Sequence, residues 1–267
     1  MGRGSHETAR RGNSYVSGRD GVAMALQAQM GGPSAGAFLG AVGLAGIAGW
    51  VDAVAYLGLH AFVANMTGAV VILGLAGAEL DGHGMVRQGL TIGGFFVGVL
   101  LARLLRRLRW GPAPCYAAAS LAVLACMGVE GAGQPEVCLL SAAMGLQNAA
   151  ATVFGGVGLN TVFLTGNLQR LGETLADPAK PGVRRGFVLG LLPAVLLTYA
   201  AGAAGGGLAM RYLGLPLLPA VVALLAAAVI ALLRGRGRIV ATSTPSAASP
   251  TLAAPTTAAP AGRTPPH

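Results

Sequence analysis

The sequence predicts an all-α fold: a polytopic helical membrane protein with about six crossings, broken or re-entrant Thr-Gly elements and an inverted internal repeat. Composition is the first reason, because 54% of the 267 residues are hydrophobic, 10% are charged and the mean hydropathy is +0.66. A soluble domain carries roughly a quarter charged residues. The second reason is the recurrence of apolar stretches of about 20 residues, each long enough to cross a hydrocarbon core of roughly 30 Å. The third is that Thr-Gly motifs bring polar side chains into these stretches.

The apolar segments follow one another between short polar loops. In chain order they lie at 35–57, 61–80, 89–105, 114–129, 137–154, 159–176, 186–210 and 213–233. They define one transmembrane domain at 35–234. Residues 1–34 contain no continuous apolar core, so we expect a loosely ordered cytoplasmic region there, with no cleaved signal peptide. The Pro-, Ala- and Thr-rich end predicts a disordered tail at 235–267.

The basic residues do not predict a nucleic-acid partner. The formal net charge is +9, but the arginines flank apolar segments and form no stripe with interleaved aromatic residues. Membrane topology accounts for them better, because Lys and Arg favour cytoplasmic loops. The expected partners are therefore the lipid bilayer and an unknown small solute or ion.

The two halves of the chain repeat similar blocks in the same order, about 35–130 and about 137–233. The aligned blocks are 49–55 (GWVDAVA) with 145–151 (GLQNAAA), 67–68 with 165–166 (both Thr-Gly), and 94–102 (GFFVGVLLA) with 186–194 (GFVLGLLPA). The preserved order predicts a duplication, which is a common way to build transporter folds. Glycines four residues apart in the last pair of blocks predict close helix approach.

The arginines decide between parallel and inverted copies. If every apolar segment crossed, the basic loop at 103–109 would face outward and the acidic loop at 130–136 would face the cytoplasm, against the positive-inside rule. If the Thr-Gly segments enter and leave on one side, every Lys and Arg except Arg87 and Arg211 is cytoplasmic, as are both termini. Each copy then crosses an odd number of times, so the second is inverted. The first Thr-Gly segment is apolar enough to cross fully, which leaves eight spans as the alternative to six.

The Thr-Gly elements are predicted to form the functional site. Backbone that leaves helical geometry inside a bilayer must be satisfied by protein or water, so broken helices occur where they line cavities. Gly68 and Gly166 are the expected break positions. The side chains that can bind a solute or the freed backbone groups are those of Asn65, Thr67, Thr165 and Asn167. A purely structural role, in which they only satisfy the broken backbone, is the alternative.

Asp52 is the acidic residue well inside a predicted span, and its repeat counterpart is neutral Asn148, beside Gln147. Ionisable groups within membranes are by default functional hypotheses, so these residues are added to the candidate solute- or ion-binding set. The alternative is an interfacial aspartate reached by water, because Asp52 lies only about 7 to 8 Å from the end of its span.

No pattern typical of an intramembrane enzyme occurs. The chain has no G-x-S-x-G, no H-E-x-x-H and no paired intramembrane carboxylates. Its histidines are too scattered for a metal centre, and its three cysteines lack metal-type spacing and are expected to pack in the core. We therefore expect no enzymatic activity, no cofactor and no metal.

Three stretches, 49–68 (GWVDAVAYLGLHAFVANMTG), 144–156 (MGLQNAAATVFGG) and 162–176 (VFLTGNLQRLGETLA), carry a family resemblance. Together they resemble the bacterial DUF1275 family, also called the YoaK family, of multi-spanning membrane proteins. The resemblance implies a bacterial inner-membrane protein and supplies no substrate. In the family pattern the first motif continues Met-Thr-Gly-Asn, whereas this chain has Ala69 there and carries Thr-Gly-Asn in the second copy.

These observations predict a small-solute transporter or channel in the bacterial plasma (inner) membrane, with a polar site at the paired Thr-Gly breaks. Half-helix ends at such breaks present oriented backbone dipoles to a solute. The alternative function is a non-transporting membrane scaffold or regulator of partner complexes.

Overall fold

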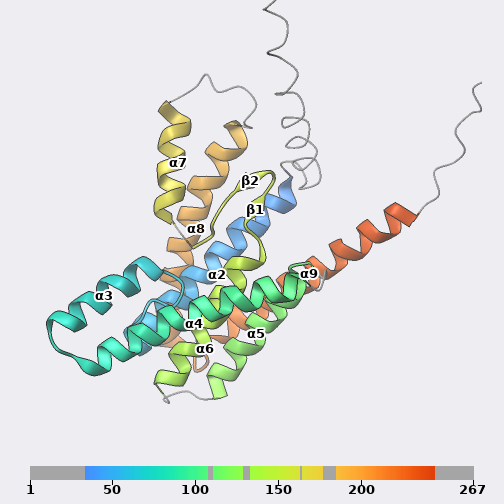
Figure 1. Ribbon diagram of the computed structural model, residues 1–267. Coiled ribbons are helices and arrows are strands. Elements are labelled where there is room, and N and C mark those ends of the chain that lie inside the picture. Colours follow the sequence, from blue (N-terminus) through green and yellow to red (C-terminus); the bar gives the residue numbers. More distant parts are fainter. Residues whose placement is uncertain (1–33, 108–110, 129–132, 163, 177–184, 244–267) are drawn as a thin grey trace, which may run out of the picture.

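The computed structural model consists of helices that follow the predicted apolar segments in order (Figure 1). It describes residues 34–107, 111–128, 133–162, 164–176 and 185–243. The elements are α2 (Ala35–Leu59), α3 (Met66–Ala78), α4 (Gly82–Arg107), α5 (Ala113–Gly128), α6 (Gln134–Ala150), β1 (Val153–Phe154), β2 (Val157–Gly158), α7 (Leu164–Ala176), α8 (Arg185–Tyr212) and α9 (Leu218–Ser243). The predicted all-α, polytopic architecture is confirmed.

The end of the helical region lies later than the sequence indicated. α9 continues to Ser243, whereas the disordered tail was expected to begin at residue 235. Residues 235–243 contain no proline, and Pro245 is the first residue of the tail that stops a helix. The expected N-terminal region at 1–34, apart from Ser34, and the rest of the tail at 244–267 lie outside the described residues.

Helix lengths separate full spans from shorter elements. α2, α4 and α8 are long and apolar enough to cross a membrane, while α3, α5 and the 218–234 part of α9 are shorter apolar helices. The helices that carry the Thr-Gly motifs, α3 and α7, have 13 residues each. At 1.5 Å per residue each is about 20 Å long, short of a hydrocarbon core of roughly 30 Å.

α2 and α8 cross with their backbones in direct contact. A Cβ atom on Gly49 would collide with the carbonyl oxygen of Tyr199, and one on Gly202 would collide with that of Gly46. Small residues allow this approach, which stabilises helix pairs in lipid through packing alone. The predicted glycines Gly186 and Gly190 of α8 have no atom near their Cβ positions within 4 Å, so the close contact lies further along the helix than the sequence indicated.

α4 and α6 repeat this crossing with equivalent residues. A Cβ on Gly98 would collide with the carbonyl oxygen of Ala142, and one on Gly145 with that of Phe95. Gly145 thus takes the place of Gly49, as the sequence alignment predicted. Gly98 takes the place of Gly202, so residues 198–206 correspond in packing to 94–102, and residues 186–194 do not. The sequence alignment paired 94–102 with 186–194 because their apolar residues are similar. The helix crossings pair 94–102 with 198–206, because these are the segments in backbone contact with α6 and α2.

The contacts also give the relative directions of the helices. α2 runs parallel to α8, since Gly46 meets Gly202 and, further along both helices, Trp50 meets Gly206. α4 is likewise parallel to α6, since Gly94 meets Cys138 and, further along both helices, Gly98 meets Ala142. α2 and α6 are antiparallel, because the start of α2 meets the end of α6 in a hydrogen bond, while the end of α2 and the start of α6 line one cavity. α4 therefore runs against α2.

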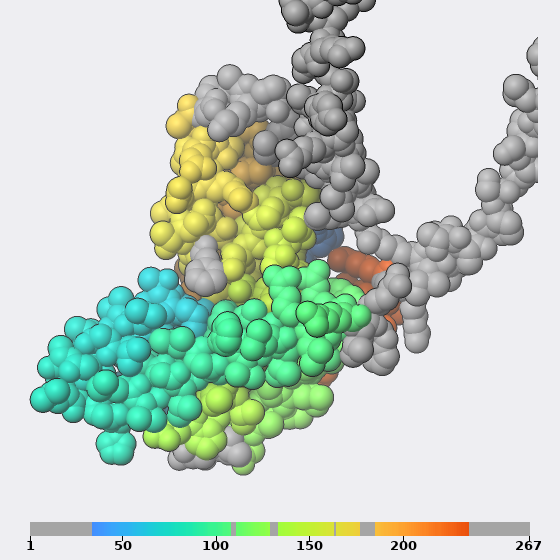
Figure 2. Space-filling view, in the orientation of Figure 1, coloured from blue at the N-terminus to red at the C-terminus, as the bar shows by residue number. Residues whose placement is uncertain are grey.

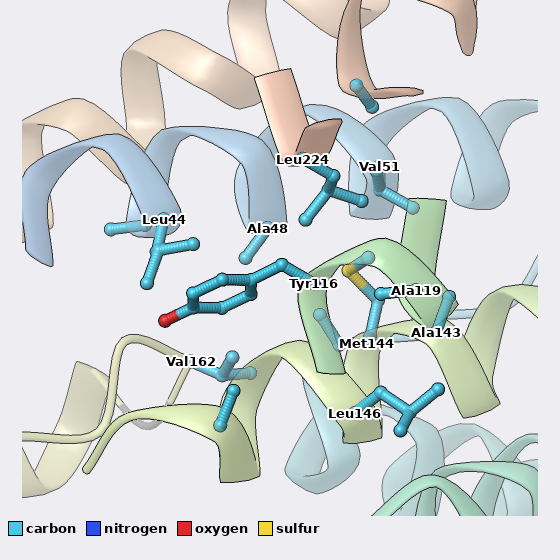
Figure 3. Close-up of a cluster of buried hydrophobic side chains, with 14 of the residues drawn as sticks. Leu44, Ala48, Val51, Tyr116, Ala119, Ala143, Met144, Leu146, Val162 and Leu224 are labelled. Atoms are coloured by element: carbon cyan, nitrogen blue, oxygen red, sulfur yellow. The ribbon is translucent and has the colours of Figure 1, made fainter. Parts of the chain in front are cut away.

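The core lies where α2, α5, α6 and α9 meet. Figure 3 shows Tyr116 of α5 between Leu44 and Ala48 of α2 on one side and Val162 on the other, with Met144 of α6 nearby. All of these side chains are buried. α3 packs on α4 and α7 on α8, and in Figures 1 and 2 these two pairs project from the central group in different directions.

Candidate functional site

Asp52 of α2 is fully engaged by hydrogen bonds. Its side chain is 2% exposed. One carboxylate oxygen accepts from the backbone N–H of Ala64 at 2.7 Å, and the other accepts from the N–H of Asn65 at 3.0 Å. The second oxygen also accepts from the hydroxyl of Tyr199 on α8. The carboxylate therefore ties α2, α8 and the irregular segment before α3 together.

The break in the first Thr-Gly element precedes its glycine. Residues 60–65 are non-helical, and Gly68 lies in the first turn of α3. Asn65 caps this turn, since its side-chain oxygen accepts from the N–H of Gly68 at 3.3 Å. Gln88 of α4 holds the other end of the break by donating to the carbonyl of His60 at 3.0 Å. The predicted break position at Gly68 is thus displaced by a few residues towards α2.

The second Thr-Gly element is built differently. Its non-helical segment, 151–162, contains the β1–β2 hairpin, and Gly166 is helical within α7. Asn167, 7% exposed, donates to the carbonyl of Asn160 at 2.8 Å. Arg170 donates to the carbonyl of Gly158. These bonds satisfy backbone groups that a helix would otherwise pair.

Gln147 and Asn148 of α6 place two oxygens in the interior without a partner. Gln147 is 1% exposed, and its amide nitrogen donates to the carbonyl of Leu44 on α2 at 2.8 Å. That bond fixes which amide atom is oxygen. The Gln147 Oε1 and the Asn148 Oδ1 are both buried and have no hydrogen-bond partner among the described residues. Leaving such an oxygen unpaired costs about 1 to 3 kcal/mol.

The packing register explains why Asn148 differs from its counterpart. Asn148 corresponds to Asp52, and Phe95 of α4 takes the position of Tyr199. Phenylalanine has no hydroxyl, so the bond that Tyr199 gives to Asp52 cannot form in the second copy. The second copy therefore has a neutral amide at Asn148 and no hydroxyl at Phe95 to donate to it. As a result, the Asn148 Oδ1 remains available as a hydrogen-bond acceptor.

Comparison with known proteins agrees with this architecture. The family model described as "Protein of unknown function (DUF1275)" matches residues 40–232, which is almost the whole helical region. The chain belongs to the DUF1275 family. It is also 36% identical over 141 residues to the UPF0700 transmembrane protein YoaK of Bacillus subtilis (strain 168), a match that covers 48% of this chain and 63% of that relative. No solved structure matches it significantly.

In this DUF1275 chain the predicted site residues form separate groups. Asp52 and Asn65 lie at the entry to α3, Gln147 and Asn148 lie at the α2–α6 contact, and Asn167 lies at the entry to α7. The remaining predicted residues, Thr67 and Thr165, are exposed. Asp52 and Leu44 are eight residues apart on α2, about 12 Å along the helix. The single central site expected from the sequence is therefore not present in this arrangement.

Two contributors were missed by the sequence analysis. Tyr199, the partner of Asp52, and Gln88, 1% exposed with its own Oε1 unpaired, were not among the predicted residues. A polar side chain within an apolar span was the available signal for both. The described residues contain no group of three or more His, Cys, Asp and Glu side chains placed to hold a metal ion.

Proposed function

We propose that this membrane protein is a transporter or channel for a small solute, and that Gln147 and Asn148 of α6 contact the solute. The observation that carries the proposal is the pair of buried, unpartnered oxygens on adjacent residues. Both groups accept hydrogen bonds, so they suit a solute that presents donors or positive charge, such as water, an ammonium group or a metal cation. An anion is excluded at these two atoms by the same chemistry.

The helix directions support a six-span, inverted-repeat topology for this function. α4 runs against α2, and Gln88 near the start of α4 bonds to His60 at the end of α2. α2 therefore ends on the side where α4 begins, so the chain between them enters and leaves on one side. With both termini cytoplasmic, α3 is a re-entrant element from outside and α7 is its inverted counterpart.

A second function is favoured by a different observation. Both oxygens of Asp52 are occupied by backbone groups and Tyr199, which is the arrangement of a structural residue. A membrane scaffold or regulator needs only such structural polar groups. In that case Gln147 and Asn148 lie in a permanently dry core, and no water-soluble reagent reaches them.

Accessibility of α6 tests the proposal. Gln147→Cys and Asn148→Cys are made separately in a chain whose native cysteines, Cys115, Cys126 and Cys138, are replaced by alanine, and each is treated with a small cationic methanethiosulfonate in membranes. We expect modification at both positions, because a solute site must be reached by water. Ser141→Cys is the matched control, since Ser141 is on the same helix, fully buried, and bonded to the carbonyl of Val137 at 2.7 Å.

The control separates a pathway from general opening of the bundle. If position 141 is modified as fast as 147 and 148, the labelling reflects general opening of α6 in place of a specific pathway, which counts against the transport proposal. If none of the three is modified in folded protein, the core is dry and the scaffold function is favoured.

A further inference from the structure

A surface hollow of about 590 Å³ lies between α2 and α8, close to the point where both helices end. Small residues of α8 open this space, since a Cβ atom on Gly207 would meet a single atom, the Cδ1 of Leu57 on α2, at 3.8 Å. The residues that line the hollow are Leu57, Ala204, Gly207, Leu208, Met210 and Arg211. The hollow is therefore apolar except for one arginine.

The hollow reaches from the membrane surface towards the membrane interior. α8 is long and apolar enough to cross a membrane, and its last two residues are Arg211 and Tyr212, which is 78% exposed. Arginine and tyrosine at the end of a span lie at the headgroup level of a bilayer. Ala204 and Leu208 precede Arg211 by about 10 and 5 Å along the helix axis. The charged and apolar parts of the hollow thus follow the order of headgroup and acyl chain in a lipid.

Arg211 is available to bind an anion. Its side chain is exposed, and within the described ranges of the chain no group is hydrogen-bonded or ion-paired to it. A guanidinium group binds phosphate through two parallel hydrogen bonds. In a zwitterionic lipid the ammonium of the headgroup competes for the phosphate, so an anionic lipid gains more from the arginine.

The geometry points to a binding site for one anionic phospholipid, with its phosphate at Arg211 and one acyl chain in the hollow against Leu57 and Gly207. A soluble phosphate compound would leave the apolar part unfilled, and an uncharged lipid would leave the arginine without an anion. The site is separate from the candidate solute site, because Leu57 lies about 20 Å along α2 from Leu44, whose carbonyl binds Gln147. The inference therefore holds for a transporter and for a scaffold alike.

Photo-crosslinking locates and compares the bound lipids. The full-length protein is placed in phosphatidylcholine nanodiscs with a small fraction of a probe that carries a diazirine on one acyl chain. The probe is either phosphatidylglycerol, which is anionic, or phosphatidylcholine. After irradiation, mass spectrometry measures adducts on Leu57 and on residues 204–210. Val222 of α9, which is 58% exposed and lies outside the hollow, reports labelling by bulk lipid.

We expect the anionic probe to label the hollow about fivefold more than the phosphatidylcholine probe, a factor typical of one basic residue at an anionic lipid surface. Both probes should label Val222 equally. Arg211→Gln should make the two probes equal at the hollow, whereas Arg87→Gln, which removes the same charge from α4, should preserve the difference. Equal labelling in the native chain, or a preference that survives Arg211→Gln, would overturn the proposal.

Inorganic phosphate distinguishes a lipid from a soluble anion. It should not lower the labelling by the anionic probe, because it has no acyl chain to fill the hollow. Displacement of the probe by inorganic phosphate would assign Arg211 to a soluble anion and contradict a lipid site.

A filling variant tests whether the acyl chain enters the hollow. Gly207→Leu places a side chain beside Leu57 without a backbone clash. Relative to Val222, labelling of residues 204–210 by the anionic probe should fall to that of the phosphatidylcholine probe, although Arg211 is intact. Undiminished labelling in Gly207→Leu would place the acyl chain elsewhere and contradict the inference.

Discussion

The hydroxyl of Tyr199 donates a hydrogen bond to the carboxylate of Asp52 across the crossing of α2 and α8. These residues are 147 positions apart in the chain, yet the same carboxylate also accepts from the N–H groups of Ala64 and Asn65. One buried acid thus joins two long helices to the start of a short one. Its first role is to hold the segment before α3 in place, whether or not it also meets a solute.

The Asp52–Tyr199 bond should be measurable as a coupling energy. Tyr199→Phe removes the donor and should lower the free energy of unfolding by about 0.5 to 2 kcal/mol, the range for polar contacts in membrane proteins. In an Asp52→Asn background the same change should have a smaller effect, because the charged acceptor is already gone. Denaturation of the four proteins in mixed micelles measures this cycle. Additive effects would mean that the hydroxyl and the carboxylate do not interact.

Asn148 and Asp52 should respond in opposite ways to the same substitution. Asn148→Leu removes a buried oxygen that has no partner, so the free energy of unfolding should stay unchanged or rise by up to about 1 kcal/mol. Asp52→Leu leaves the N–H groups of Ala64 and Asn65 unpaired and should lower it by at least about 2 kcal/mol. Thermal unfolding in nanodiscs compares the two. A large loss from Asn148→Leu would indicate that this amide has a structural partner in the membrane.

The glycines at the helix crossings should be far less tolerant than other glycines of the same helix. Gly98→Ala places a methyl group against the backbone of Ala142, whereas Gly93→Ala meets no atom within 4 Å. We expect the first change to lower the free energy of unfolding by about 1 to 3 kcal/mol, as overpacking does. The second should be neutral or stabilise by up to about 1 kcal/mol through helix propensity. Equal effects would mean that α4 and α6 are not in backbone contact.

The sequence predicted the order and approximate limits of the helices because apolar length alone carries that information. It placed the break at Gly68, but the break lies at 60–65. There the backbone donates hydrogen bonds to Asp52 and accepts one from Gln88, and these bonds replace the usual Gly or Pro signal. Such bonds come from distant parts of the chain and leave no local pattern. The Gly155-Gly156 turn of the hairpin, with φ of 59° and 80°, did carry a local signal for a β-turn.

The candidate site was only partly predictable. Asp52, Gln147 and Asn148 were found because polar groups are rare in apolar spans. The sequence did not indicate Tyr199 as the partner of Asp52, because the similar apolar residues of 94–102 and 186–194 align these two segments and leave Tyr199 outside the repeat. The packing register equates Phe95 with Tyr199, and only backbone contacts reveal it.

The direction of α4 relative to α2 predicts on which side of the membrane the loop between α3 and α4 lies. The loop between α3 and α4 should lie outside, since Gln88 reaches back to His60 at the end of α2. His83 is exposed in the first turn of α4, directly after this loop, so His83→Cys in a cysteine-free chain should react with a membrane-impermeant maleimide in intact cells. Lys180→Cys, in the basic segment after α7, should react only after permeabilisation. Protection of position 83 would mean that α3 crosses fully, which contradicts the antiparallel arrangement of α2 and α4 and removes the inverted repeat as support for transport.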